Sequence, residues 1–255
     1  MTEEFSLPIL PEIWQATLDW HQAASQQAQF QQLYEGILAG NAQLNLTRIT
    51  QPEEFWEKHL WDSLVGIQPW LKASPPEAFQ FGLGESAQPK VIDIGTGGGF
   101  PGIPVAIAQP TWNLTLLDST RKKLAFLDAL LPELGLQNVQ TLVGRAEEAG
   151  VQASHRAAYD LALIRAVAGV TICAEYCLPL LKVGGFAVLY RGQWSEEEAI
   201  ALQSAVEVLG GAVVAIEPVT LPLSQGVRHS IYLQKTQKTP ARYPRSPGVP
   251  GQKPL

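Results

Sequence analysis

The chain has 255 residues, of which 46% are hydrophobic and 16% charged, so it is long enough for one sizeable core with a smaller attached domain. Its net charge of −6 at pH 7 argues against a protein that coats nucleic acid with its whole surface, although it leaves room for a local basic patch.

The termini and the cysteines narrow the class further. The first residues, MTEEFSLPIL, lack the pattern of a signal peptide, and no apolar run approaches the roughly 18 residues of a membrane span. Cys173 and Cys177 are the only cysteines, and their spacing suits neither a disulfide framework nor a zinc site. We therefore expect a cytoplasmic protein with no membrane association, no metal and no obligate protein partner.

The N-terminal part of the chain predicts helices. Within residues 11–40 an apolar face at i, i+3, i+4, i+7 and i+8 predicts one helix, and its members are Phe30, Leu33, Tyr34, Ile37 and Leu38. The stretch GNAQLNLTRIT (40–50) breaks this pattern, and a second helix is expected from Pro52 through EEFWEKHLWDSLVGI. Residues 72–90 are rich in Pro, Gly and Ser. We therefore predict a helical domain at 1–71 and a linker at 72–88.

Strand-like and helix-like segments alternate after the linker. The expected strands are 90–94, 113–118, 138–143, 159–164, 186–190, 212–219 and 228–235, and the expected helices are 102–108, 120–134, 168–182 and 195–209. Strands that alternate with helices predict a mostly parallel sheet, and apolar strands predict burial on both faces. The main domain is therefore expected to be an α/β fold at 89–235, followed by a basic, proline-rich, extended tail at 236–255.

The segment VIDIGTGGGFPGIPVAIA (91–108) joins the first strand to a helix through a glycine-rich turn. In an open parallel sheet such a turn lies where ligands bind, because glycines let a ligand approach the backbone and the helix presents free N–H groups. Two registers fit. Gly97, Gly99 and Gly102 satisfy the dinucleotide pattern G-x-G-x-x-G, whereas a turn that begins directly after Ile94 gives Gly95-Thr-Gly-Gly-Gly.

An acid in the strand favours the second register. Asp93 lies inside the end of the strand, which is unusual for dinucleotide folds, and an acid followed by G-x-G-x-G resembles the first motif of S-adenosylmethionine-dependent methyltransferases. Asp118, at the end of the next strand, is placed to bind ribose hydroxyls in either register. S-adenosyl-L-methionine is therefore the expected cofactor, with a nicotinamide cofactor and a turn without any ligand as alternatives.

The segment GRAEE (144–148) follows the third strand and places Ala146 and Glu147 at the same edge of the sheet. The backbone N–H of Ala146 and the carboxylate of Glu147 are candidates to bind the adenine of the cofactor. The alternative for Glu147 is a solvated acid at the start of a helix.

The fourth strand bears on the methyl acceptor. Exocyclic amino groups of bases usually require an [Asn/Asp]-Pro-Pro-aromatic loop after this strand, but the sequence there is LIRAVAGV. Carbon-5 of a pyrimidine requires a cysteine nucleophile, and both cysteines lie in a predicted helix as core residues. The remaining candidates for the methyl acceptor are an atom with its own lone pair, such as guanine N7, and small molecules. Arg165 is the candidate to bind a guanine, a phosphate or the cofactor, with a local salt bridge as its alternative.

Several segments in a fixed order resemble one protein family. They are NLTRIT, HLWDSL, VIDIGTGGGFPGIPVAIAQP, LTLLDSTRKKLAFL, GRAEE, IRAVA, LPLLKVGG and YPRSPGVPGQKPL. Together they resemble the bacterial small-subunit ribosomal RNA guanine-N7 methyltransferases, the glucose-inhibited division protein B family. The resemblance implies a class I methyltransferase fold, Rossmann-like with a mostly parallel seven-stranded sheet, and a small N-terminal helical domain. It also implies methyl transfer from S-adenosyl-L-methionine to N7 of a guanine in the 530 loop of 16S ribosomal RNA, in the small subunit or its assembly intermediate.

The resemblance further implies roles for individual residues. Cofactor-binding positions are Gly95, Gly97 and Phe100 in the glycine-rich segment, Asp118, Ser119 and Thr120 beside the ribose and adenine, Ala146 and Glu147 beside the adenine, and Arg165. Catalytic positions are Arg165 and, facing the site from the N-terminal domain, Asn45, His59 and Asp62. On the residues alone, His59 and Asp62 share a helix face and can act together, or form an exposed pair without a role. Arg191 stands where the family usually has Lys, so an identical contact is not implied there.

Basic residues near the expected site are compatible with an RNA substrate despite the acidic average. They are Arg48, Lys58, Arg121, Lys122, Lys123, Arg165 and Arg191, with Lys238, Arg242, Arg245 and Lys253 in the tail. The lysines of RKKL alternatively form a solvated helix start. Two other function classes stay open: an NAD-dependent oxidoreductase, if the offset glycine register operates, and a nonenzymatic RNA-binding module.

Overall fold

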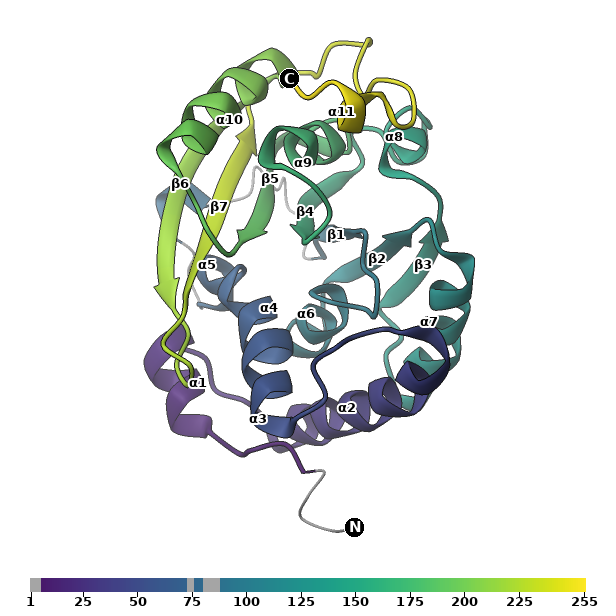
Figure 1. The fold of residues 1–255 in the computed structure, drawn as a ribbon, viewed down its shortest axis with the longest axis vertical. Helices are drawn as coiled ribbons and strands as arrows, with labels where there is room; N and C mark the ends of the chain where they lie inside the picture. The colour runs from purple at the N-terminus through teal and green to yellow at the C-terminus, as the bar shows by residue number, and fades with distance from the viewer. Residues whose placement is uncertain (1–5, 73–75, 80–87) are drawn as a thin grey trace.

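The computed structural model describes residues 6–72, 76–79 and 88–255. The expected linker at 72–88 lies largely outside these residues, and its described part contains the short 3₁₀ turn Glu77–Phe79. Elsewhere the chain forms a seven-stranded sheet between two layers of helices (Figure 1). Within the described ranges, every helix is too short or too polar to cross a membrane.

The sheet confirms the expected α/β architecture. Its strand order is β3-β2-β1-β4-β5-β7-β6, and all neighbours run parallel except β5–β7 and β7–β6. The strands are β1 Lys90–Ile94, β2 Asn113–Asp118, β3 Val139–Val143, β4 Tyr159–Arg165, β5 Leu181–Arg191, β6 Gly211–Thr220 and β7 Val227–Lys235. All seven expected strands are present. β5 begins earlier than expected because Leu181 already pairs with Tyr159, ahead of an irregularity in the ladder.

Successive residues of the central strands face opposite sides of the sheet, and each side has its own apolar core. Val91 and Leu161 pack into one cluster, whereas Ile92 and Ala162 pack into the other. Both faces are covered by helices, which is why the strands are apolar throughout. One layer contains α1 Pro11–Leu18, α2 Ala24–Leu44, α3 Pro52–Phe55, α4 Asp62–Val65, α5 Gln68–Leu71, α6 Gly102–Ala108 and α7 Arg121–Glu133 (Figure 1). The other contains α8 Ala146–Ala149, α9 Val170–Cys177, α10 Glu196–Leu209 and α11 Val249–Gln252.

The single helix expected at 11–40 is wrong. α1 ends at Leu18, Asp19 takes a left-handed conformation with φ of 53°, and α2 begins only at Ala24. The break lets the chain turn back so that Trp14 packs against Phe30 at the start of α2. Apolar periodicity does not reveal such a turn, because both helices bury apolar faces in the same core.

The end of α2 also differs from expectation. Gly40 does not break the helix, which continues to Leu44 and ends at Asn45 in a left-handed conformation. A Cβ on Gly40 would lie 2.4 Å from the ring of Phe126 in α7. The glycine therefore permits a close approach between two helices rather than a turn.

The second predicted helix is confirmed, with mixed geometry. α3 passes into a π-helical turn, Trp56–Trp61, which passes into α4. His59 lies in the π-helical turn and Asp62 begins α4. Such turns widen a helix locally and often occur at functional sites.

The N-terminal helices are fixed to the sheet layer by hydrogen bonds as well as by the shared core. Gln26 and Gln29 of α2 donate to the carbonyl oxygens of Ile107 and Leu134, both at 2.9 Å. On the other side of this layer, the hydroxyl of Tyr190 in β5 donates to the carbonyl oxygen of Ser63 at 2.8 Å. These helices therefore form one rigid layer against the sheet.

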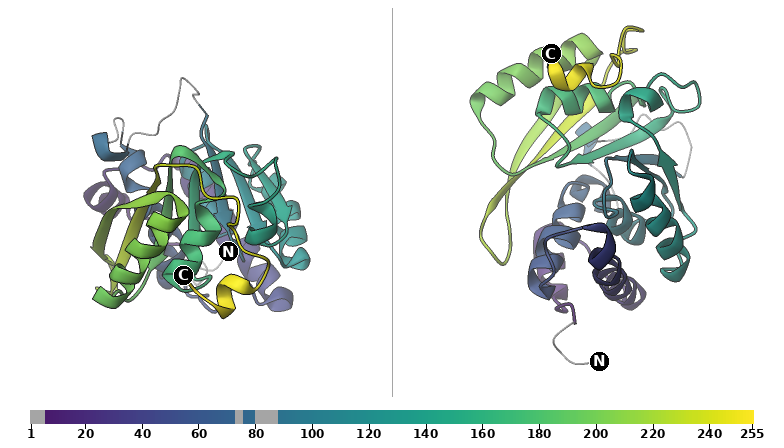
Figure 2. Two further views of the ribbon diagram at one scale, coloured as in Figure 1. Left: turned by 90° about the horizontal axis from the view of Figure 1, so that it is seen from above. Right: turned by 45° about the vertical axis from the view of Figure 1, so that its right-hand side comes forward.

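The C-terminal tail is mostly irregular, as expected, but it packs against α8 and α9 instead of extending freely (Figure 2). Arg245 forms an ion pair at 2.5 Å with Glu175, a fully buried acid in α9. The N–H of Gly248 donates to the carboxylate of Glu147 at 3.0 Å. The prediction that Arg245 serves as a free cation for phosphate is therefore wrong, because a buried carboxylate requires this partner.

Candidate active site

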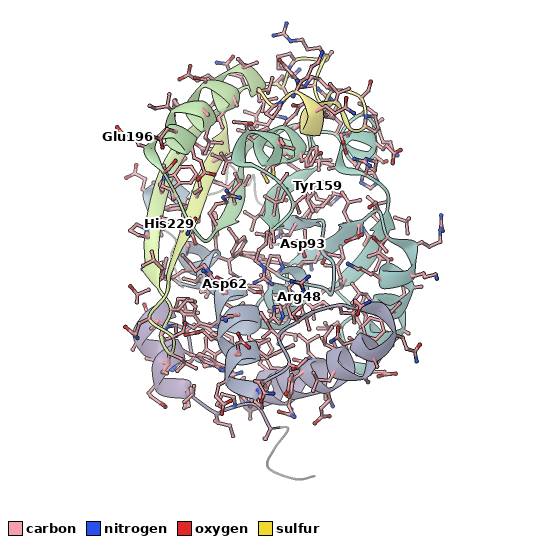
Figure 3. The ribbon with its side chains drawn as sticks, in the orientation of Figure 1. Arg48, Asp62, Asp93, Tyr159, Glu196 and His229 are labelled. Atoms are coloured by element: carbon pink, nitrogen blue, oxygen red, sulfur yellow. The ribbon has the colours of Figure 1, made fainter. Side chains whose placement is uncertain are left out.

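Two cavities lie at the edge where the parallel strands β1, β2 and β4 end. The glycine-loop cavity, of about 250 Å³, is lined by Ile94, Gly95, Leu117, Asp118, Ser119, Gly144, Arg145, Ala146, Glu147, Val167, Ala168 and Tyr176. The Arg165 cavity, of about 430 Å³, is lined by Ile49, Lys58, His59, Asp62, Val65, Arg165, Ala166, Tyr190, Arg191, Gly192, Arg228, His229 and Ser230. Figure 3 shows Asp93 and Asp62 near the middle of the molecule, with His229 to one side.

The glycine turn has a backbone that only glycine adopts without strain. Gly95 and Gly97 have φ of 71° and 58°. A Cβ on Gly95 would lie 2.5 Å from Val167, whereas one on Gly97 would meet only the carbonyl oxygen of Gly95 at 3.9 Å. The N–H of Gly97 donates to Asp118 at 2.9 Å, which ties the turn to the end of β2. The register that begins at Gly95 is thus the one that lines the cavity.

Asp93 lies beneath this turn and is fully buried. Its Oδ2 accepts hydrogen bonds from the hydroxyl of Thr96 at 2.6 Å and from the N–H of Gly102 at 2.9 Å. Its Oδ1 has no partner among the described residues. Burial raises the pKa of Asp93 to about 6, although both hydrogen bonds oppose this shift. Asp93 lines neither cavity, so its carboxylate holds the turn through Thr96 and Gly102 rather than contacting a bound molecule.

Asp118, Ser119 and Thr120 lie together after β2. Asp118 accepts from the N–H groups of Gly97 and Thr120, and each of its oxygens keeps a free lone pair. Ser119 lines the glycine-loop cavity with Asp118. Thr120 is the residue before α7 and does not line the cavity.

Ala146 and Glu147 also line the glycine-loop cavity, as the sequence predicts for this edge. Glu147 is buried, and its Oε1 accepts from Gly248, Tyr176 and Arg145 at 3.0, 3.3 and 3.4 Å. Burial alone raises its pKa, but these hydrogen bonds and the charge of Arg145 bring the pKa below its usual value. The solvated acid considered as the alternative is therefore wrong, because this carboxylate is enclosed and joins the tail to the cavity.

Arg165 ends β4 and connects three groups of the N-terminal helices. Its Nη1 donates to Asp62 at 2.7 Å and to the carbonyl oxygen of Lys58 at 3.0 Å. Its Nη2 lies 3.4 Å from Nδ1 of His59, and its guanidinium carbon lies 5.9 Å from the centre of the Phe100 ring. The pair with Asp62 is largely enclosed, with side-chain exposures of 14% and 9%. Arg165 forms the local salt bridge considered as its alternative and also lines a cavity, so its role in binding a guanine, a phosphate or the cofactor stays a prediction.

His59 is held on both faces and at both nitrogens. Its ring stacks on Phe100 at 4.3 Å, and its Nε2 lies 2.7 Å from the hydroxyl of Thr47. Burial and the charges of Arg165 and Lys58 lower the pKa of His59 to about 3. The ring is therefore neutral, and its neighbours assign the proton to Nε2, so that Nδ1 presents a lone pair to Arg165. His59 and Asp62 are thus not an exposed helical pair.

A short loop separates the two cavities. Ala166 lines the Arg165 cavity, and the next residue, Val167, lines the glycine-loop cavity. Ala166 has φ of 56°, in the left-handed region that a residue with a Cβ rarely adopts. Consecutive residues of this loop therefore line the two cavities, which lie side by side.

The structure places some predicted site residues elsewhere. Asn45 is exposed, ends α2 as its left-handed cap and lines neither cavity. Phe100 lies under His59, not in the lining of the glycine-loop cavity. Arg191 lines the Arg165 cavity but pairs with Glu198 at 2.6 Å.

Sequence reasoning missed Thr47, Tyr190, Arg228 and His229. Arg228 and His229 of β7 line the Arg165 cavity, and Nε of Arg228 lies 3.7 Å from Asp62. A polar Arg-His pair at the start of an otherwise apolar strand was the available signal. Thr47 had no signal, because its contact with His59 depends on the path of the chain after α2.

A cysteine nucleophile and a metal ion are the remaining alternatives for chemistry. Cys173 and Cys177 are buried thiols in α9, and burial raises the pKa of Cys173 to about 11. They are therefore core residues, as predicted, and unsuited to nucleophilic attack. Among the described residues, no group of three His, Cys, Asp or Glu side chains is arranged to hold a metal ion.

The GidB family model, described as rRNA small subunit methyltransferase G, matches residues 26–227. The chain belongs to the GidB family. Proteins named ribosomal RNA small subunit methyltransferase G are similar to it over 98% of both chains in Nostoc punctiforme (58% identical) and Trichormus variabilis (59%), and over the full length of both in Synechococcus elongatus (57%). Among solved structures, a putative methyltransferase from Thermoplasma acidophilum is 14% identical, with a TM-score of 0.48 over 61% of this chain and 72% of that chain.

Membership of the GidB family makes this chain an S-adenosylmethionine-dependent methyltransferase with a class I, Rossmann-like fold. The oxidoreductase and the nonenzymatic module are therefore excluded. The glycine-loop cavity fits S-adenosyl-L-methionine on its own evidence. Gly95 and Val167 line it so closely that a Cβ on Gly95 would lie 2.5 Å from Val167, and Asp118 has lone pairs to offer hydroxyl groups.

Proposed function

We propose that this protein transfers the methyl group of S-adenosyl-L-methionine to N7 of a guanine in the 530-loop region of 16S ribosomal RNA. The observation that carries the proposal is the pair of adjoining cavities, with only Ala166 and Val167 between them. One has the chemistry for a nucleoside cofactor, and the other is lined by cations. The names of the close relatives support a small-subunit ribosomal RNA as the substrate. That substrate places the reaction in the cytoplasm.

The residues favour an acceptor that needs no activation. The bound cofactor supplies an electrophilic methyl group. The loop after β4 is Arg165-Ala-Val-Ala, without the motif for amino-group methylation, and the cysteines are buried. N7 of guanine carries its own lone pair, so catalysis requires positioning rather than a general base. A neutral His59 is consistent with this, because it orients Arg165 without removing a proton.

We assign guanine recognition to Arg165. Its Nη1 is engaged by Asp62 and the Lys58 carbonyl, while its Nη2 has only the long contact to His59. Nη2 is therefore the donor available to the O6 edge of a guanine. Arg228 and Lys58 line the same cavity and supply charge for the flanking phosphates. Lys58 does so in part only, because it also pairs with Glu54.

We assign cofactor binding to Gly95, Asp118, Ser119, Ala146 and Glu147, which line the glycine-loop cavity, with Gly97 supporting the turn. Gly97→Ala tests this assignment, because open space surrounds its Cβ and only its φ of 58° opposes the change. The strain is on the order of 1–2 kcal/mol. Calorimetry should show weaker binding of S-adenosylhomocysteine in a folded variant, and unchanged affinity would contradict the assignment.

The acceptor is tested by nucleoside mass spectrometry. Unmethylated 16S ribosomal RNA is supplied naked, in small subunits and in assembly intermediates, with labelled S-adenosyl-L-methionine. The expected product is N7-methylguanosine alone, in at least one of the three forms. Methyladenosine or methylcytidine would overturn the proposal, and the preferred form identifies the physiological substrate.

A further inference from the structure

A third cavity lies at the opposite edge of the sheet. It has a volume of about 460 Å³ and is lined by Arg156, Lys182, Lys235, Lys238 and Thr239, with three small apolar residues. β4 begins beside it at Tyr159 and reaches Arg165 after six further residues, so the two sites are about 20 Å apart. The Arg156 pocket, as we call it, is thus separate from the methyltransferase site.

The charges of the Arg156 pocket are not balanced. Among the described residues, the acid that pairs with one of these cations is Asp160, which lies 2.7 Å from Lys182. The described residues that line the pocket include no acid. Lys235 is 2% exposed and donates to the carbonyl oxygens of Leu178 and Leu181, so its positive charge faces only dipoles. Burial and the charge of Arg156 lower its pKa to about 8, as expected for cations crowded without a counterion.

The buried hydroxyl of Thr239 indicates the kind of ligand that the Arg156 pocket would bind. Thr239 is 7% exposed, and its Oγ1 has no hydrogen-bond partner among the described residues. A buried hydroxyl without a partner is costly unless a ligand accepts its hydrogen bond. Its position among four cations makes that acceptor an anion.

The backbone around Thr239 is built to hold this arrangement. Nη1 of Arg156 donates to the carbonyl oxygens of Gly150 and Tyr243 at 2.9 and 2.7 Å, and its Nη2 donates to that of Thr239 at 3.0 Å. The guanidinium thereby fixes the start of the C-terminal tail over the pocket. Lys238, the residue before Thr239, is exposed and has a mobile charge to close on a ligand.

We propose that the Arg156 pocket binds the phosphate group of a small molecule. The walls formed by Ala153, Ala157 and Val183 offer apolar surface beside the cations, and the volume exceeds what inorganic phosphate fills. Inorganic phosphate and a nucleoside monophosphate share the recognised group. The volume and the apolar walls suit a small molecule, and binding of RNA alone is the outcome that would contradict the proposal.

Calorimetry with saturating S-adenosylhomocysteine tests this, since the glycine-loop cavity is then blocked. Inorganic phosphate and adenosine 5′-monophosphate are titrated separately, at constant ionic strength, with adenosine as the uncharged control. We expect one site for phosphate and tighter binding of the monophosphate, but none for adenosine. Thr239→Val and Lys238→Gln should each weaken binding roughly tenfold, because a hydrogen bond or charge to an anion is lost. Lys72→Gln, an exposed lysine outside the pocket, should bind as the unaltered protein does.

The variants are chosen so that folding does not confuse the result. Oγ1 of Thr239 makes no hydrogen bond, so Thr239→Val should melt at the same temperature or higher, and Lys238→Gln changes an exposed side chain. Absence of binding by both phosphate compounds at millimolar concentration overturns the proposal. Equal affinity in both variants, or binding only of an RNA oligonucleotide, overturns it as well.

Discussion

Two enclosed arginine–carboxylate pairs lie on opposite faces of the sheet. Arg245 saturates Glu175, which is fully buried, through its Nε, its Nη2 and its backbone N–H. Arg165 binds Asp62 through one nitrogen only, and Asp62 is shared with Arg228. The pair of Arg245 and Glu175 thus holds the C-terminal tail, whereas the pair of Arg165 and Asp62 leaves N–H donors facing the Arg165 cavity. Unused hydrogen-bonding capacity, rather than the ion pair itself, distinguishes the functional site.

The largest effect should come from the pair that holds the tail. Arg245→Ala leaves the fully buried Glu175 without its partner and should lower the free energy of unfolding by about 3–5 kcal/mol. Denaturant unfolding measures this, with Glu196→Ala on the exposed start of α10 as the control. Methyl transfer per folded molecule should survive. An unchanged unfolding free energy would contradict the structural role.

Arg165→Ala should show the opposite profile. Losing the donor that orients the guanine should cost about 1–3 kcal/mol of recognition, and hence about 5- to 150-fold in the single-turnover rate. The melting temperature should fall less than in Arg245→Ala, because Asp62 keeps Arg228 nearby whereas no other cation of the described residues pairs with Glu175. Arg165→Lys keeps the charge without the planar fork, so it should stay impaired. Normal rates with a lowered melting temperature would make Arg165 a structural partner only.

Arg228→Ala should have a smaller effect, since its side chain is one-third exposed and lies 3.7 Å from Asp62. An exposed pair contributes at most about 1 kcal/mol to stability. RNA affinity should fall severalfold, and its salt dependence should lose about one unit of slope. S-adenosylhomocysteine binding should not change. Lys90→Ala, exposed at the other end of β1, is the matched control and should keep the full salt dependence.

The smallest effect is expected in the pH profile of methyl transfer. His59 stays neutral down to about pH 3, so the charge around Arg165 should not change between pH 5 and 8 through this residue. A plot of the methylation rate against pH should show no step near pH 6.5 that depends on His59. His59→Gln should therefore leave the shape of this plot unchanged. The unfolded chain binds a proton on His59 near pH 6.5 that the folded protein does not, so the contribution of His59 to the unfolding free energy falls as the pH drops below 6.5. Asp93, with its pKa raised to about 6, contributes in the opposite direction. The His59 contribution is measured as the difference in pH dependence between the unaltered protein and His59→Gln. A rate step lost with the imidazole would show that His59 titrates during the reaction.

The sheet and the glycine-loop cavity were predictable because their signals are local. Strand periodicity gave all seven strands, and the acid before the glycines gave the register of the turn. Parallel strands bring their ends to one edge, so Asp118 and Ala146 followed from strand order alone.

The Arg165 cavity was predictable only in part, because its walls come from segments far apart in the chain. Arg165 followed from its place at the end of β4, whereas the family resemblance was needed to bring His59 and Asp62 to the same site. Thr47 and Arg228 reach it through the path of the loop after α2 and an antiparallel strand, which no local pattern encodes. Asn45 failed for the same reason, since its left-handed conformation ends a helix instead of facing the cavity.

The N-terminal helices share one apolar core with the sheet and are bonded to it at Ile107, Leu134 and Ser63. Because the described part of this layer is held by both the core and these hydrogen bonds, we expect it to keep its position when the proposed RNA substrate binds. We therefore expect the conformational change on binding to occur mainly in the RNA. The target base has to be turned out of its stack before it reaches Arg165, and the cost of that unstacking falls on the RNA. Selection among guanines would then favour those that already lie in loosely stacked loops.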